Sequence, residues 1–305
     1  MSSTREPDAP AASTEARNPR TAALDLLEGE DLARALHGEN HLVAPAIDPE
    51  LPAIGRAIEL IASHLDQGGR LLYVGAGTSG RIGVLDASEC PPTFGVDPDT
   101  VQAIIAGGEA AIRFSVEGAE DDRNAGARAV WDQAVGPLDV VVGIAASGRT
   151  PYVLGALEAA RQAGAATIAV VNVRPSEMER AADLAIAAVT GAEPVAGSTR
   201  MKAGTAQKMV LNLLSTGAMA RIGRIYGNLM VDVRPTNAKL RDRAARIVME
   251  AAGATREAAE RALEEADWEV KTAIVMAARR VDAGEARRLL ASSRGRLRPV
   301  LEAAA

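Results

Sequence analysis

The sequence predicts an α/β protein in which a parallel sheet is covered by helices on both faces. Continuous apolar, β-branched runs occur at five places, and segments with helical spacing of apolar residues separate them. Runs without polar alternation are typical of strands buried on both faces, and helices between parallel strands form right-handed crossovers. The predicted strands are 70–75, 101–106, 139–145, 166–172 and 183–189.

Length and composition exclude several classes of partner. The chain has 305 residues, 48% of them hydrophobic, which is enough for a sizeable core. Its formal net charge is −6 and only 2% of its residues are aromatic, so we expect no nucleic-acid partner. One cysteine and three histidines are too few for a disulfide framework or a structural zinc site, and we expect neither a metal nor a cofactor.

Targeting signals are missing as well. The N-terminal stretch has acidic residues and prolines where a signal peptide would carry a cationic start and an apolar core. No apolar run approaches the roughly 18 residues of a membrane span. We therefore expect a cytoplasmic protein with no membrane partner.

The two ends of the chain differ from the middle. Residues 1–14 are rich in Ala, Pro, Ser and Thr, which predicts a disordered tail, and helical spacing over 15–58 predicts an N-terminal helical arm. The sheet domain spans 59–222, and a connector, 223–238, leads to a helical module at 239–305 without strand signals. The predicted helices of this module are 239–252, 256–266, 268–280 and 283–291.

One glycine-rich loop after the first predicted strand indicates a phosphate site. The apolar run stops at Gly75, a loop of Gly, Thr and Ser follows, and an amphipathic helix resumes at Arg81. Such a loop binds phosphate because glycines let the backbone approach, bare N–H groups face the ligand and a helix start adds partial positive charge.

The same loop satisfies the dinucleotide-binding pattern Gly75-x-Gly77-x-x-Gly80. That fold also requires an acidic residue at the end of the second strand to hold the ribose. Here the second predicted strand runs into Gly107 and Gly108 instead. A sugar phosphate is therefore the preferred ligand.

An internal repeat strengthens this prediction. Residues 74–81 and 142–149 share the pattern V-G-x-x-x-S-G-R, each at the end of a strand and the start of a helix, so the two loops are expected to face one crevice. Thr150 and Pro151 extend the second loop into its helix. Helix capping is the ordinary role of a single hydroxyl there, but paired loops favour ligand binding. A third helix start, at 197–202, adds hydroxyls and two cations.

Carboxylates are the remaining acid–base candidates, because no metal set and no Cys–His or Ser–His pair is evident. Asp86 and Glu89 follow the first loop, and Glu89 is expected just beyond its helix. A second acidic cluster, 117–122, precedes a helix that begins near Arg123. For that cluster a solvated acidic helix start is the simpler interpretation, and spacing alone does not single out the working carboxylate.

Seven collinear motifs together resemble the N-acetylmuramic acid 6-phosphate etherases, and the resemblance runs from 14–21 to the C-terminal helices. It implies a three-layer, flavodoxin-like sugar isomerase (SIS) domain, a homodimer with sites near the interface, and a C-terminal bundle of the ubiquitin-associated (UBA-like) type. The motifs are GAGTSGR at 75–81, DASECPPTFG at 86–95, IAGGE at 105–109, VEGAED at 116–121, IAASGRTPYV at 144–153, GSTRMKAGTAQK at 197–208 and NLMVDV at 228–233.

The resemblance also implies a reaction and its residues. The lactyl ether at C3 of a phosphosugar substrate is cleaved with water, giving N-acetylglucosamine 6-phosphate and D-lactate in cell-wall sugar recycling. Glu89 corresponds to the proton donor and Glu120 to the second acid–base residue, with Glu117 the less favoured choice in its motif. The implied phosphate ligands are Thr78, Ser79, Gly80, Ser147, Gly148 and Thr150, completed by Ser198, Thr199 or Lys202.

Two features depart from relatives of the same fold, and two other functions stay open. Ala145 and Ala146 stand where phosphosugar isomerases of the glucosamine-6-phosphate synthase type carry polar groups, and HGENH at 37–41 is less acidic than expected. The alternatives are a sugar-phosphate-sensing regulator, as in the glucokinase regulatory protein with its two SIS domains, and an aldose–ketose phosphosugar isomerase.

Overall fold

A computed structural model describes residues 13–302, so most of the predicted tail lies outside the described residues. Ser13–Glu15 forms a short 3-10 helix in which Thr14 is buried. The chain divides into two compact units. Of the described residues, the first unit comprises 13–87 together with 99–214, and the second comprises 88–98 together with 215–302.

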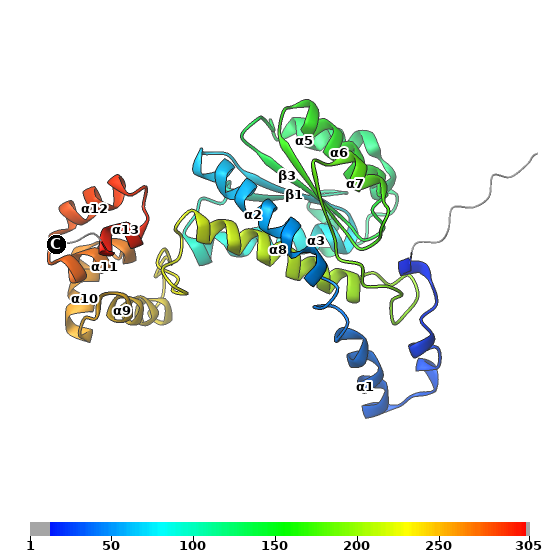
Figure 1. Ribbon diagram of the computed structural model, residues 1–305, viewed down its shortest axis with the longest axis horizontal. Coiled ribbons are helices and arrows are strands. Elements are labelled where there is room, and N and C mark those ends of the chain that lie inside the picture. Colours follow the sequence, from blue (N-terminus) through cyan, green and yellow to red (C-terminus); the bar gives the residue numbers. More distant parts are fainter. Residues whose placement is uncertain (1–12, 303–305) are drawn as a thin grey trace, which may run out of the picture. The chain divides into compact units, whose positions relative to one another are not determined.

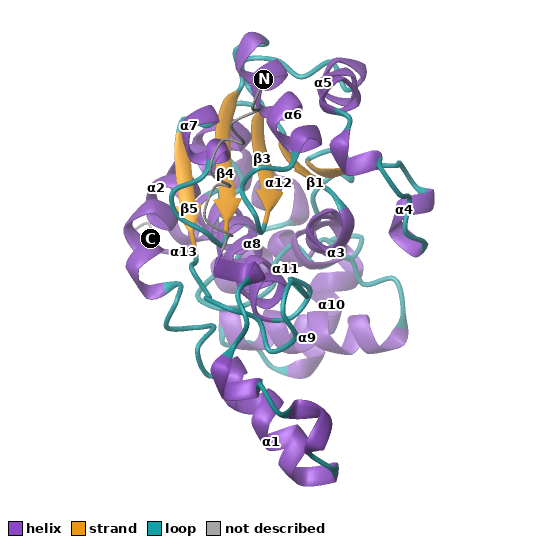
Figure 2. Ribbon diagram, turned by 90° about the vertical axis from the view of Figure 1, so that its right-hand side faces the viewer, coloured by secondary structure: helices purple, strands orange, loops and turns teal. Residues whose placement is uncertain are grey.

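The first unit is built on one parallel sheet with the strand order β2-β1-β3-β4-β5. All five predicted strands are confirmed, each within two residues of its predicted ends, and Figure 2 shows β3, β4 and β5 pointing the same way. Every residue of β1 and β3 is buried, as expected for strands covered on both faces. The strands are β1 (Leu71–Gly75), β2 (Val101–Ile105), β3 (Val140–Ala145), β4 (Ala166–Val171) and β5 (Leu184–Ala187).

Helices cover both faces of this sheet and make the three layers predicted from sequence. Figure 1 shows α5, α6 and α7 along one face and α2, α3 and α8 along the other. The helices of this unit are α1 (Gly29–Asn40), α2 (Leu51–Asp66), α3 (Gly77–Phe94), α4 (Ala110–Arg113), α5 (Arg123–Asp132), α6 (Pro151–Gln162), α7 (Glu177–Ala181) and α8 (Lys202–Arg221), with α3 and α8 ending in the second unit.

Helices α5 and α6 pack backbone against backbone. A Cβ on Gly126 would lie 1.9 Å from the carbonyl oxygen of Tyr152, and a Cβ on Gly155 would lie 2.0 Å from that of Arg123. No side chain fits at either position. These two glycines therefore set how closely α5, which follows the acidic segment, approaches α6, which follows the second loop.

Helix α3 differs from the sequence prediction at both ends. The sequence predicted a loop up to residue 80 and a helix that ends before Glu89, whereas the helix begins at Gly77 and continues through Pro91 and Pro92 to Phe94. Prolines remove backbone donors and ordinarily end a helix. Phe94 is buried beyond them, and packing of this kind outweighs local propensity. Glu89 is thus an exposed residue inside the helix.

The N-terminal arm is anchored by a buried carboxylate. Glu39 of α1 has a side chain only 3% exposed, and it lies 2.7 Å from the ammonium of Lys202, which is 0% exposed. Arg20 and Asn18 donate to the same carboxylate at 2.5 and 2.7 Å. The hydrogen bond from Arg20, with further bonds from Lys202 and Asn18, outweighs burial and lowers the pKa of Glu39 to about 2.

The second unit is a helical bundle, as predicted. Asn237, Thr255 and Asp282 cap the starts of α9, α10 and α12 through their side chains. The helix predicted from 268 begins at Val270, because Trp268 has a left-handed backbone conformation, φ 64°. The helices are α9 (Ala238–Ala252), α10 (Arg256–Glu265), α11 (Val270–Arg279), α12 (Ala283–Ser292) and α13 (Leu297–Glu302).

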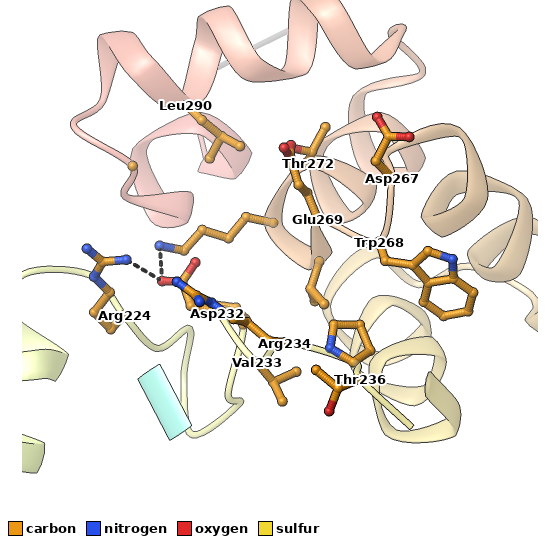
Figure 3. Close-up of a pocket in the computed structure, with 15 residues that line it drawn as sticks. Arg224, Asp232, Val233, Arg234, Thr236, Asp267, Trp268, Glu269, Thr272 and Leu290 are labelled. Carbon is orange, nitrogen blue, oxygen red and sulfur yellow. Dashed lines mark hydrogen bonds and ion pairs between the residues drawn. The ribbon is translucent and has the colours of Figure 1, made fainter. Parts of the chain in front are cut away.

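An ion pair inside this unit joins the connector to the bundle. Figure 3 shows a pocket of about 550 Å³ lined by the connector segment 231–236 and by residues around the start of α11. Asp232 lies 2.5 Å from the ammonium of Lys271 and 3.6 Å from the guanidinium of Arg224. Burial raises the pKa of Asp232 and lowers that of Lys271, although each partner's charge opposes the shift.

Candidate functional site

The first loop is a tight turn from β1 directly into α3. A Cβ on Gly75 would lie 2.7 Å from the backbone nitrogen of Gly80, and a Cβ on Gly80 would lie 2.6 Å from Ile105. Gly77, which begins the helix, has φ 52°. Glycines at these three positions therefore let the chain turn at once, and they place Thr78 and Ser79 in the first turn of α3.

The second loop links β3 to α6 in a similar way. Gly148 has φ 63°, and a Cβ there would lie 2.4 Å from Cβ of Ser176. Thr150 is the N-cap residue of α6, yet its hydroxyl makes no capping hydrogen bond. The hydroxyl of Ser147 accepts a long bond, 3.4 Å, from the backbone N–H of Arg149. Hydroxyls at this loop are therefore available to a ligand.

The two loops lie along one pocket, as the internal repeat predicted. Strands β1 and β3 are neighbours, and the chain leaves them toward opposite edges of the sheet, which is the switch point where ligands bind in open α/β folds. The pocket has a volume of about 600 Å³ and is lined by Glu15, Ala76, Gly77, Thr78, Ser79, Glu120, Asp121, Ile144, Ala145, Ala146, Ser147, Arg149, Thr150, Pro151 and Thr199.

A chain of buried hydrogen bonds orients Ser79. Its Oγ donates to Oε1 of Gln207 at 2.9 Å, Nε2 of Gln207 donates to Oδ1 of Asn172 at 2.9 Å, and Nδ2 of Asn172 donates to the carbonyl of Ala188 at 2.8 Å. A carbonyl only accepts, so the direction of the whole chain is fixed from Ala188 back to Ser79. Asp86, the other acidic candidate near this loop, is buried and accepts from Tyr73 and Asn212.

The third predicted helix start contributes less than the other two. Thr199 lines the pocket, whereas Ser198 and Lys202 do not. The ammonium of Lys202 is held by Glu39, and the backbone N–H groups of Lys202 and Ala203 both donate to the buried carboxylate of Glu193 at 2.9 Å. Lys202 is therefore a structural cation of the arm, and the backbone donors that begin α8 are already bonded.

Glu120 lines the pocket and is exposed. It belongs to the short 3-10 helix Ala119–Asp121, which follows Gly118 with φ 71°. Glu120 lines both this pocket and a smaller neighbouring cavity, whereas Glu117 lines only the smaller one. A carboxylate next to the two loops is suitably placed for proton transfer to a bound sugar.

Glu89 is not brought to this pocket within the described chain. It follows Thr78 by 11 residues along α3, about three helical turns, and is exposed. Gly80 and Gly148, also predicted as phosphate ligands, do not line the pocket. Their lack of a side chain instead allows the close approaches within the two loops.

Three charged lining residues were missed from sequence. Arg149 is part of the repeated S-G-R pattern, so the repeat itself was the signal that a cation belongs to the second loop. Asp121 adjoins Glu120 in the acidic motif. Glu15 comes from the arm, where no local pattern distinguishes it, and only the fold brings it to the pocket.

Between residues 13 and 302, no group of three His, Cys, Asp or Glu side chains is arranged to hold a metal ion. No helix within the same part of the chain is long and apolar enough to cross a membrane.

Comparison with known proteins decides the family. Residues 53–161 match the glucokinase regulatory protein N-terminal SIS domain, and residues 125–217 match the SIS domain. The N-acetylmuramic acid 6-phosphate etherases of Salmonella typhi and Salmonella typhimurium are each 52% identical over 289 residues, covering 95% of this chain and 97% of theirs. The chain belongs to the N-acetylmuramic acid 6-phosphate etherase family.

Solved structures of lower similarity also align with this etherase family member. The phosphoheptose isomerase of Neisseria gonorrhoeae is 17% identical with a TM-score of 0.47, covering 63% of this chain and 98% of that protein. The phosphoheptose isomerase of Francisella tularensis is 17% identical with a TM-score of 0.44, covering 62% of this chain and 95% of that one.

Proposed function

We propose that the protein cleaves the D-lactyl ether of N-acetylmuramic acid 6-phosphate, giving N-acetylglucosamine 6-phosphate and D-lactate in amino-sugar recycling in the cytoplasm. The observation that carries this proposal is the carboxylate of Glu120 beside two phosphate-type loops in one pocket. The near full-length similarity to the curated etherases supports the same reaction.

The substrate's phosphate is assigned to the two loops. Thr78, Ser147 and Thr150 supply hydroxyls, and the helix starts of α3 and α6 supply partial positive charge. Arg149 adds a full charge at the second loop, and Thr199 completes the site. The three carboxylates of Glu15, Glu120 and Asp121 outnumber that single positive charge, so hydroxyl and backbone donors are expected to provide much of the binding.

The reaction requires a base and an acid. In the open-chain sugar, the C1 aldehyde acidifies the C2 proton. We assign its removal to Glu120, while an acid protonates the C3 ether oxygen and lactate leaves as a neutral alcohol. Water then adds at C3 of the unsaturated aldehyde, and the two groups exchange roles. General acid–base catalysis of this kind contributes roughly 10² to 10⁴ per group.

Glu89 is proposed as the acid, supplied by a second copy of the chain. It is exposed and does not line the pocket in its own chain, so a homodimer in which Glu89 enters the partner's pocket would complete each site. Each active site would then combine groups from two chains.

The test is to incubate the protein with N-acetylmuramic acid 6-phosphate in deuterated water. D-lactate release together with deuterium at C2 is the expected result. Glu120→Ala should abolish both, and wild-type exchange in that variant would show that the base is another residue. A purely regulatory phosphosugar binder would release no lactate. An aldose–ketose isomerase would exchange C2 and produce a ketose without lactate.

A further inference from the structure

A second cavity of about 320 Å³ adjoins the phosphate pocket. The two share Ala76, Gly77 and Glu120, so they meet at the carboxylate proposed as the base. The rest of the smaller cavity comes from α3 and from the segment 106–119. Its further lining residues are Arg81, Ala106, Ala111, Phe114, Ser115, Val116, Glu117, Gly118 and Ala119.

Arg81 is held firmly at this cavity. Its Nε donates to the carbonyl of Ile112 at 3.0 Å, and its Nη2 donates to the carbonyl of Phe114 at 3.1 Å. A guanidinium has five N–H donors, so three remain after these two bonds. Within residues 13–302, no carboxylate forms an ion pair with Arg81. Its positive charge is therefore not neutralised by an ion pair within that part of the chain.

The remaining lining includes both small apolar and acidic residues. Among the lining residues, the small apolar side chains of Ala106, Ala111 and Val116 suit a methyl group. The carboxylates of Glu117 and Glu120 repel an anionic group placed beside them. A ligand carboxylate is therefore directed to Arg81. A branched group that carries one methyl and one carboxylate matches this lining.

We propose that this cavity is the subsite for the lactyl group, with Arg81 pairing to the lactyl carboxylate. The inference rests on the proposed function, because it takes Glu120 as the base at C2. The ether is on the adjacent carbon, C3, so its substituent lies beside Glu120. The acetamido group on C2 is neutral, so it can accept a hydrogen bond from Arg81 but does not neutralise its charge as a carboxylate does.

The experiment compares two reactions of the same protein. Ether cleavage of N-acetylmuramic acid 6-phosphate requires the lactyl subsite. Exchange of the C2 proton of N-acetylglucosamine 6-phosphate with deuterated water requires only the phosphate loops and the base. Arg81→Gln should raise KM for cleavage by roughly 10- to 100-fold, the usual effect of losing hydrogen bonds to a charged group. The KM of Arg81→Lys for cleavage should lie between those of the wild type and Arg81→Gln, because lysine keeps the charge without the planar fork.

Arg113→Gln is the matched control. Arg113 is an exposed arginine on the neighbouring segment and does not line either cavity. The Arg113→Gln variant therefore loses the same charge but should keep the wild-type KM. Unchanged exchange in Arg81→Gln together with the raised KM would support the subsite.

Three outcomes separate failure of this inference from failure of the proposed function. Wild-type protein that releases no D-lactate overturns the function and the subsite with it. Active wild-type protein with an unchanged KM in Arg81→Gln overturns the subsite alone. Loss of exchange in Arg81→Gln, in step with loss of cleavage, would show that Arg81 only holds the carbonyls of 112 and 114, and would also overturn it.

Discussion

The hydroxyl of Ser79 donates a 2.9 Å hydrogen bond to Oε1 of Gln207, a residue 128 positions away in the sequence. This bond uses the only proton that Ser79 can donate, so in this state Ser79 presents lone pairs to the pocket. It can accept from a substrate hydroxyl or a water, and it donates to phosphate only after leaving Gln207. The helix start and the hydroxyl of Thr78 are the donors on this side that need no rearrangement.

Replacing Gln207 by methionine should destabilise the sheet domain by about 1–3 kcal/mol, because Oδ1 of Asn172 loses its donor inside the protein. Urea unfolding of the two proteins gives the difference. Lys208→Met, at the next and exposed position of the same helix, should be close to wild type. Equal stability of Gln207→Met and Lys208→Met would show that the buried chain contributes nothing.

Substitution of Gly126 by alanine should destabilise the protein by about 1–3 kcal/mol or more, since the added methyl would lie 1.9 Å from a carbonyl oxygen of α6 and force the helices apart. Thermal unfolding reports the loss. Gly136→Ala is the control, because no atom lies within 4 Å of its Cβ position and its φ is not positive. A Gly126→Ala melting temperature equal to that of Gly136→Ala would contradict the close packing.

The pKa of Glu39, about 2, gives the arm a defined acid sensitivity. A carboxylate whose pKa is lower when folded stabilises the protein above its unfolded pKa and loses that contribution as pH falls. Because folding lowers the pKa of Glu39 from 4.5 to about 2, the free energy of unfolding decreases by roughly 3 kcal/mol as the pH falls through that range. Denaturant unfolding at a series of pH values should show this decline in wild type.

Glu39→Gln should show a much smaller decline over the same range, and it should be less stable at neutral pH because Lys202 is left buried without its carboxylate. Glu30→Gln, on the exposed face of the same helix, should keep the wild-type profile. Parallel profiles for Glu39→Gln and wild type would assign the acid sensitivity to other groups.

Removing one member of the Asp232 and Lys271 pair should be worse than removing both. Lys271→Met leaves a largely buried carboxylate with only the more distant Arg224, and it should cost about 3–5 kcal/mol, whereas the double variant with Asp232→Asn should recover most of that loss. A double-mutant cycle by chemical unfolding measures the coupling. Additive single effects would mean that the ion pair does not join connector and bundle.

Mixing subunits tests where Glu89 acts. Glu89→Gln and Glu120→Gln should each be inactive alone, yet after refolding together they should regain about a quarter of wild-type activity, because half of the dimers are mixed and one of their two sites is intact. Glu59 is an exposed glutamate of α2, and a mixture of Glu59→Gln with wild-type protein, refolded in the same way, is the control. No recovery in the first mixture would place Glu89 outside the partner's site.

The strands were predictable because continuous β-branched runs report burial on both faces, and the two loops were predictable because they repeat one pattern. The start of α3 was not predictable, since Gly, Thr and Ser favour loops locally, whereas the helix begins at Gly77. The partners of Ser79, Lys202 and Arg81 lie far from them in sequence. Hydrogen bonds of that kind have no local signature.

Glu193 has a consequence for how a substrate can enter. Its carboxylate occupies the first backbone donors of α8, so the chain's own anion already fills a place that would otherwise attract phosphate. Under the proposed function, a phosphosugar therefore meets two open helix starts, those of α3 and α6, and one closed one, that of α8. Glu193 would then leave only the two loops beside Glu120 for the phosphate.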